Sequence, residues 1–133
     1  MKLEDSCVSI KGAGIDLVEV PRIRSILEKH AERFVGRTFT DGERAYCESC
    51  ADPAMHFAAR FAAKEAAAKA LGTGVWAEGV DWKDFEVTRA ANGRPGLLLH
   101  GAALARADAL GVRAAHLSLS HTRELAIAQV IFE

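Results

Sequence analysis

The chain has 133 residues, of which 50% are hydrophobic and 26% charged, and its formal net charge is −1. This length predicts one domain over residues 1–133, and the balanced charge argues against binding to nucleic acid or to a membrane surface. The longest apolar stretch, residues 58–71, is interrupted by charged side chains, so no transmembrane segment is predicted. Glu4 and Asp5 stand where a signal peptide would be basic, which favours a cytoplasmic protein.

The first predicted elements are a strand and a helix. Residues 9–18 have the pattern of a strand, in which Gly12 and Gly14 keep the side chains small. Pro21 suits the first turn of a helix. We expect that helix to run to about Phe34, with Gly36 interrupting the pattern.

Two more helices are predicted in the middle of the chain. Thr40-Asp-Gly-Glu43 matches a capping box, so a helix should begin there and end near Cys50. Asp52-Pro53 provides an N-cap and a first helical residue for a third helix over residues 54–71. This helix is rich in alanine, the best helix former.

The last part of the chain predicts strands. Residues 84–89 and 97–100 form a hairpin around Asn92-Gly93. After a short helix over residues 102–110 come two further strands, at residues 116–120 and 125–132. The predicted fold class is therefore α+β, an antiparallel sheet with helices packed on one side.

Three cysteines, an odd number, predict no disulfide framework. Cys47 and Cys50 form a CxxC pair, for which Cys7 and His56 are only loose additional metal ligands. The pair lies late in a predicted helix, where the macrodipole does not favour a thiolate. We therefore favour small core or half-exposed cysteines over a metal or redox site.

Asp16 ends an otherwise apolar strand. A carboxylate there is costly to bury unless it has a partner. The alternatives are an N-cap for the following helix or a solvated strand end, and the local pattern does not separate them.

The alanine-rich helix carries two charged pairs at i,i+4 spacing. Arg60 and Lys64 share one face, and Glu65 and Lys69 share the adjacent face. The alanines would let this helix pack close to a sheet. An ordinary surface ion pair between Glu65 and Lys69 explains the spacing equally well.

Small polar groups gather where residues 116–122 leave their strand. Ser120, His121 and Thr122 supply hydroxyls, an imidazole and backbone N–H groups, which suit a phosphate. The alternative is a turn in which a hydroxyl organises the hairpin. A Ser/His hydrolase ranks lower, because no G-x-S-x-G motif is present, and no P-loop motif is present either.

Taken in order, these segments resemble the 4′-phosphopantetheinyl transferase superfamily, and within it the short stand-alone holo-acyl-carrier-protein synthases. The resemblance covers Gly12 to about Glu133 and leaves residues 1–9 as an N-terminal extension of unknown role. The motifs that carry it are Gly-Ile-Asp16, Phe57-x-x-Arg60-Phe61-x-x-Lys64-Glu65-Ala-x-x-Lys69, Asn92-Gly93-Arg94-Pro95 and Leu117-Ser-Leu-Ser-His121-Thr122.

The resemblance implies a role for each matching position. Asp16 and Glu65 would bind Mg²⁺, and together with Lys69 they would form the catalytic group. Arg22 and Arg24 would meet the acidic carrier protein. Contacts to coenzyme A would come from Arg60, Lys64, Asn92, Gly93, Pro95, Ser120, His121 and Thr122.

The implied reaction moves the 4′-phosphopantetheine group of coenzyme A onto a serine of an apo-acyl carrier protein, in fatty acid biosynthesis, and releases adenosine 3′,5′-bisphosphate. Glu65 would take the serine proton, either directly or through a metal-held water. The resemblance also implies a homotrimer with active sites between subunits. We expect Asp16 and His121 to come from one subunit and Arg60 and Lys64 from its neighbour. The alternative function is a non-catalytic module that binds coenzyme A or the carrier protein.

Overall fold

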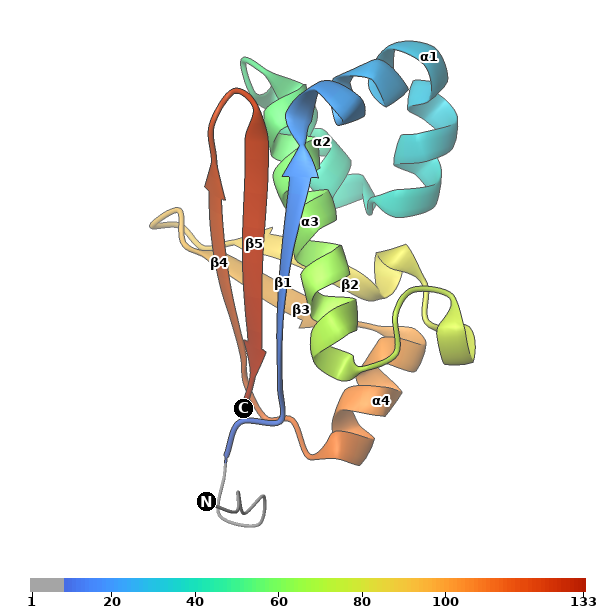
Figure 1. Cartoon of the computed structure of the whole chain (residues 1–133), viewed down its shortest axis with the longest axis vertical. Coiled ribbons are helices and arrows are strands. Elements are labelled where there is room, and N and C mark those ends of the chain that lie inside the picture. The colour runs from blue at the N-terminus through green and yellow to red at the C-terminus, as the bar shows by residue number, and fades with distance from the viewer. Residues whose placement is uncertain (1–8) are drawn as a thin grey trace.

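The computed structural model describes residues 9–133, so Cys7 and most of the predicted N-terminal extension lie outside the described residues. The elements follow the predicted order (Figure 1). The helices are α1 (Val20–Thr38), α2 (Asp41–Ser49), α3 (Pro53–Leu71) and α4 (Gly101–Leu110). The strands are β1 (Gly12–Glu19), β2 (Phe85–Arg89), β3 (Pro95–Leu99), β4 (Ala115–His121) and β5 (Leu125–Phe132). Two short 3₁₀ helices, η1 (Ala77–Gly79) and η2 (Trp82–Asp84), precede β2.

The strands form two antiparallel sheets. A three-stranded sheet has the order β1-β5-β4, and β2 and β3 form a separate hairpin. In the first sheet Asp16 lies opposite Ala128, and Leu119 lies opposite the same residue on the other side. The α+β prediction is confirmed, although the expected sheet is divided in two. Figure 1 shows the long helix α3 lying along the three-stranded sheet, with the hairpin crossing beyond its strands.

Very small residues bring α3 against β1. A Cβ atom placed on Gly12 would lie 2.0 Å from the carbonyl oxygen of Ala70, and one on Gly14 would lie 1.9 Å from that of Ala66. No side chain fits at such distances, so the two glycines and the alanine face of α3 permit this close packing. Asp16 and Glu65 belong to these two tightly packed elements.

Helix α1 is longer than predicted. It continues through Gly36 to Thr38, and its only non-helical backbone angles fall at His30 (φ −142°, ψ 36°). Glycine lowers helix propensity, but Val35 and Thr38 in the last turn are buried. Burial of these two side chains in the last turn therefore outweighs the low helix propensity of Gly36.

The predicted start of α2 is confirmed. Thr40 Oγ1 accepts a hydrogen bond from the Glu43 backbone N–H at 3.2 Å, and Glu43 Oε1 accepts one from the Thr40 N–H at 2.9 Å. This is the reciprocal pattern of a capping box. Among the helices of the described chain, none is both long enough and apolar enough to cross a membrane.

Candidate active site

Two acidic side chains that are distant in the sequence line one hollow. Asp16 reaches it from β1 and Glu65 from α3, with Arg22 of α1 and Phe61 of α3 beside them. Along β1 the side chains of Ile15 and Leu17 are exposed, so Asp16 points to the opposite face, toward α3. The N-cap of α1 is Glu19, which rules out the alternative in which Asp16 caps that helix.

Lys69 completes this group. Its Nζ lies 2.9 Å from Asp16 Oδ1 and donates a second hydrogen bond to the carbonyl oxygen of Ile15 at 3.1 Å. The sequence pattern left open a simple surface pair between Glu65 and Lys69. The ion pair in the structure joins Lys69 to Asp16 instead and so links α3 to β1. The three predicted catalytic residues therefore lie together; we name Asp16, Glu65 and Lys69 the acidic site.

The pKa of Glu65 is raised above its ordinary value. Burial is the main cause and the nearby charge of Asp16 adds to it, while Lys69 and Arg22 act in the opposite direction. Like charges interact in this way only when they are close. The ionised Glu65 side chain is therefore held in the folded protein at a cost in stability.

Glu65→Gln is expected to stabilise the protein without added metal ions. A raised native pKa means that the ionised carboxylate opposes folding at pH 7, and the neutral amide removes this effect. The gain should disappear as the pH falls through the native pKa of Glu65, since the wild-type carboxyl is then protonated too. Thermal unfolding from pH 3 to pH 8 in a chelator measures it, and we expect a higher melting temperature than wild type at pH 7 and equal melting temperatures at pH 3. If Glu65→Gln were less stable than wild type at pH 7, the ionised Glu65 carboxylate would not oppose folding, which would contradict its raised pKa.

Asp16 and Glu65 suit a hard divalent cation. Magnesium prefers oxygen ligands and typically takes one or two protein carboxylates, the rest of its shell being water and phosphate. Within residues 9–133 no group of three or more His, Cys, Asp or Glu side chains gathers as a closed metal cage. The two carboxylates therefore fit a metal shared with a ligand better than a structural metal site.

A second pocket, of mainly basic character, lies on another side of α3. Arg60 of α3 and Arg89 of β2 flank the ring of Tyr46, with guanidinium carbons 4.3 Å and 4.8 Å from its centroid. Arg89 also donates a hydrogen bond to the Tyr46 hydroxyl. Arg60 is buried, and its Nε has no hydrogen-bond partner in the described part of the chain. We name this the basic pocket, lined by Tyr46, His56, Ala59, Arg60, Arg89, Gly93, Pro95, Leu119 and His121.

Two histidines face each other in the basic pocket. The rings of His56 and His121 meet edge to face with centroids 5.5 Å apart. Burial, and then the charges of Arg60 and His121, lower the pKa of His56. The two arginines of the lining supply positive charge, the imidazoles can add hydrogen bonds, and no Asp or Glu belongs to the described lining, so the pocket suits an anionic ligand. Arg60 and His121 line one pocket of one chain, which differs from the expectation that a ligand receives them from different subunits.

Several residues predicted to contact coenzyme A lie outside this pocket lining. Asn92 accepts a hydrogen bond from the Arg94 N–H at 3.0 Å and so shapes the hairpin turn. Thr122 Oγ1 accepts hydrogen bonds from the N–H groups of Glu124 and Leu125, which confirms the turn alternative for this residue. Ser120 is exposed on β4, opposite Ile127.

The prediction for Lys64 needs correction. This side chain was expected to contact coenzyme A phosphates beside Arg60, but it is completely buried. Its Nζ donates hydrogen bonds to Glu43 Oε1, to the Trp82 carbonyl and to the Phe85 carbonyl. An ammonium group has three donors, and all three are used inside the protein. Lys64 therefore cannot reach a ligand in this structure.

The two arginines predicted to meet a carrier protein have different surroundings. Arg22 is exposed at the rim of the hollow that contains Asp16 and Glu65. Arg24 makes a bidentate ion pair with Asp52, at 2.9 Å and 3.0 Å, and joins α1 to the start of α3. Arg22 is thus the freer of the two to bind a partner.

The CxxC pair has the properties of ordinary cysteines. Cys47 is buried, which raises the pKa of its thiol to about 12, and Cys50 donates a weak hydrogen bond to the Tyr46 carbonyl. Both thiols are free. A thiol with such a high pKa is a poor nucleophile and a poor metal ligand at neutral pH.

Sequence reasoning missed Tyr46, His56 and Arg89 as pocket residues. One signal for His56 was available, because it precedes Arg60 by four residues and so shares its helix face. Tyr46 and Arg89 come from α2 and β2, and only the tertiary packing brings them to Arg60.

The comparisons with known proteins identify the family of this chain. The family described as the 4′-phosphopantetheinyl transferase superfamily matches residues 12–129. The holo-[acyl-carrier-protein] synthase of Koribacter versatilis is 54% identical over 124 residues, covering 93% of this chain and 98% of the relative. The corresponding protein of Solibacter usitatus is 50% identical with the same coverage.

Solved structures of holo-[acyl-carrier-protein] synthases have the same fold as this chain. The crystal structure of the holo-[acyl-carrier-protein] synthase from Neisseria meningitidis superposes with a TM-score of 0.84 at 31% identity, covering 93% of this chain and 98% of that one. The enzyme from Bacillus anthracis in complex with CoA (3′,5′-ADP) has a TM-score of 0.77 at 35% identity, covering 94% and 97%. By sequence and by fold, this chain belongs to the 4′-phosphopantetheinyl transferase superfamily, among its short holo-[acyl-carrier-protein] synthases.

Proposed function

We propose that this protein transfers the 4′-phosphopantetheine group of coenzyme A to a serine of an apo-acyl carrier protein and releases adenosine 3′,5′-bisphosphate. The observation that carries the proposal is the acidic site, in which three charged residues from β1 and α3 come together. Relatives more than half identical in sequence have the same activity in their names. Fatty acid biosynthesis is the process in which such a carrier protein serves.

The reaction is a phosphoryl transfer. The serine oxygen of the carrier attacks the phosphorus on the pantetheine side of the pyrophosphate, and the bond from that phosphorus to the bridging oxygen breaks. The serine proton needs an acceptor, for which Glu65 is the candidate, directly or through a water molecule. Its raised pKa makes it a stronger base than an exposed glutamate. Lys69 lies where a cation would stabilise charge that develops on the phosphate oxygens.

We infer that Asp16 and Glu65 hold a Mg²⁺ ion during this reaction. Their carboxylates line one hollow and are the hard oxygen donors that the ion prefers. When bound, the ion would neutralise charge on the pyrophosphate. The role of the chain itself is to orient these two side chains and to keep Lys69 beside Asp16.

Coenzyme A carries anionic groups at two places, and the fold offers two matching sites. The reacting pyrophosphate must lie at the acidic site, which leaves the 3′-phosphate of the nucleotide for a separate group of hydrogen-bond donors that includes positive charge. The basic pocket provides Arg60, Arg89 and His121 for it, with Gly93 and Pro95 bordering the nucleotide. Arg60 Nε is a buried donor that lacks an acceptor within the described residues.

We also propose that the active enzyme is a homotrimer, as the family resemblance implies. The outer face of the three-stranded sheet carries an exposed apolar patch on β1, where Ile15 and Leu17 are more than half exposed (55% and 57%). These two side chains, together with Ile127, surround a shallow hollow that also reaches Asp16 and Lys69. A second subunit packed on this face would therefore touch the acidic site.

The arrangement of the two sites supports the same conclusion. The described residues that line the acidic hollow and those that line the basic pocket have no member in common. If one coenzyme A molecule uses both sites, a neighbouring subunit can supply the second one. We infer that the acidic site of one subunit works with the basic pocket of the next.

A charge on the outer sheet face is expected to dissociate the trimer and to abolish transfer. Leu17→Glu places a carboxylate in the proposed interface, where it would be buried without a partner. Light scattering after gel filtration should give a monomer mass, and activity should fall with it. Leu104→Glu, on the exposed face of α4, is the matched control and should change neither. A fully active monomer of the wild-type protein would contradict the assembly.

Arg22 is the proposed contact for the acidic carrier protein, since it is exposed beside the carboxylates that must receive the serine. Arg24 is already paired with Asp52, so we expect a smaller contribution from it. Coenzyme A and carrier proteins are partners found in the cytoplasm, which is the location we propose.

The function is tested by incubating the protein with apo-acyl carrier protein, coenzyme A and Mg²⁺. Mass spectrometry should show the carrier gaining one phosphopantetheine group, and the gain should disappear in a chelator. A carrier of unchanged mass, with coenzyme A still bound in calorimetry, would instead identify a binding module without catalysis.

A further inference from the structure

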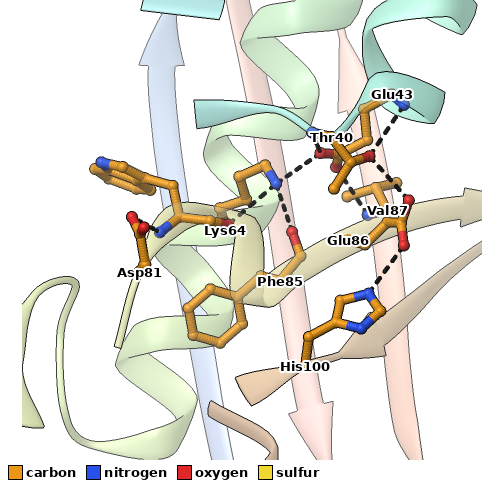
Figure 2. Close-up of polar contacts among 9 residues, drawn as sticks. Thr40, Glu43, Lys64, Asp81, Phe85, Glu86, Val87 and His100 are labelled. Carbon is orange, nitrogen blue, oxygen red and sulfur yellow. Dashed lines mark hydrogen bonds and ion pairs between the residues drawn. The ribbon is translucent and has the colours of Figure 1, made fainter. Parts of the chain in front are cut away.

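A buried ion pair joins three elements behind the basic pocket. Lys64 lies in the middle of α3 and Glu43 in the first turn of α2, and the side chains of both are fully buried. Lys64 Nζ lies 2.8 Å from Glu43 Oε1 and also donates hydrogen bonds to the carbonyls of Trp82 and Phe85. Figure 2 shows these contacts converging between the helices and β2.

Both carboxylate oxygens of Glu43 accept hydrogen bonds inside the protein. Its Oε1 also accepts a hydrogen bond from the Thr40 N–H at 2.9 Å, and its Oε2 accepts one from the Val87 N–H at 2.9 Å. Burial lowers the pKa of Lys64, while the charge of Glu43 raises it. A single buried charge without its partner would strongly destabilise the fold, so each of the two groups depends on the other.

The pair occupies the free edge of β2. Within residues 9–133 this strand pairs with β3 alone, so the backbone groups of its other edge have no neighbouring strand there. Phe85 and Val87 are alternate residues, whose backbone groups point to the same edge. Lys64 donates a hydrogen bond to the Phe85 carbonyl, and Glu43 accepts one from the Val87 N–H. The two side chains thus satisfy backbone groups that a neighbouring strand would otherwise bind.

The hairpin held in this way forms one wall of the basic pocket. Arg89 lies two residues after Val87 on β2, and Gly93 and Pro95 follow in the same hairpin. Arg60 forms the facing wall, one turn before Lys64 on α3. The spacing between the two walls therefore depends on where the ion pair holds β2 against α3.

We propose that Glu43 and Lys64 are positioning residues that set the width of the basic pocket, and hence the affinity for the nucleotide end of coenzyme A, without touching it. This inference rests on the proposed use of coenzyme A at that pocket. The bond from Thr40 Oγ1 to Glu86 and the contact of Glu86 with His100 extend the same network along the hairpin.

Lys64→Met tests the proposal, because methionine has a similar length but no charge. We expect a KM for coenzyme A about tenfold higher, a matching loss of affinity for adenosine 3′,5′-bisphosphate in calorimetry, and an unchanged KM for the carrier protein. Turnover at saturating coenzyme A should change by less than about threefold. A role confined to stability would lower the melting temperature and leave the KM for coenzyme A at its wild-type value.

Val130→Ala is the matched control. This residue is buried in β5 and lines neither the basic pocket nor the acidic hollow, so its truncation should lower the melting temperature with no change in either KM. If Lys64→Met does not fold, the double variant Glu43→Gln/Lys64→Met serves instead, since it removes both charges and leaves neither of them buried alone. A variant with the wild-type KM for coenzyme A overturns the inference. If wild-type protein shows no transfer in the same assay, the proposed function itself is overturned. The assay therefore distinguishes failure of the proposed function from failure of this inference.

Discussion

Asp16→Asn and Glu65→Gln are each expected to lower kcat for phosphopantetheine transfer by about a thousandfold, at saturating coenzyme A and Mg²⁺. Both replacements keep the size of the side chain and remove its charge. The two carboxylates line one hollow, so losing either leaves an incomplete site for the divalent ion. Glu65→Gln also removes the candidate base.

The two residues should act as a unit. The double variant is then expected to lose little more activity than either single variant, because groups that share one task are strongly non-additive. Transfer is measured by the mass gain of the carrier protein over a range of Mg²⁺ concentrations. Asp108→Asn, an exposed carboxylate on α4, is the control and should leave transfer unchanged. Either single variant with near-normal turnover at every Mg²⁺ concentration would show that the metal assignment is wrong.

Local signals in the sequence predicted the elements well. The capping box at Thr40 and the proline at residue 53 begin α2 and α3 where expected, because these signals act through neighbouring backbone groups. The end of α1 was wrong for the opposite reason. Burial of Val35 and Thr38 is a tertiary effect, and the glycine between them gave a misleading local signal.

Some features of the candidate site could also be predicted from the sequence, and others depended on tertiary packing. Asp16, Glu65 and Lys69 could be named in advance because motif order revealed a family, and the small residues of β1 and α3 explain why they meet. The pattern could not reveal that Lys64 is buried. Its spacing from Arg60 suggests a shared basic surface, whereas its partner, Glu43, already had a complete local explanation as part of a capping box.

Arg60→Ala is expected to raise the KM for coenzyme A by about 10- to 100-fold, with a smaller change in kcat. A hydrogen bond to a charged group contributes roughly 1.5–3 kcal/mol, which corresponds to this range. Arg60 is buried against Tyr46 and opposite Arg89, so its guanidinium is already oriented and little freedom is lost on binding.

Dephospho-coenzyme A, which lacks the 3′-phosphate, identifies the group that Arg60 binds. If the basic pocket holds the 3′-phosphate, wild-type protein should use this donor poorly, and Arg60→Ala should reduce its use by less than about threefold further. Arg89→Ala should behave in the same way, since both arginines flank one pocket. Arg113→Ala, an exposed arginine outside it, should affect neither donor. An equal loss with both donors would place Arg60 at the pyrophosphate instead, because that group is common to the two molecules.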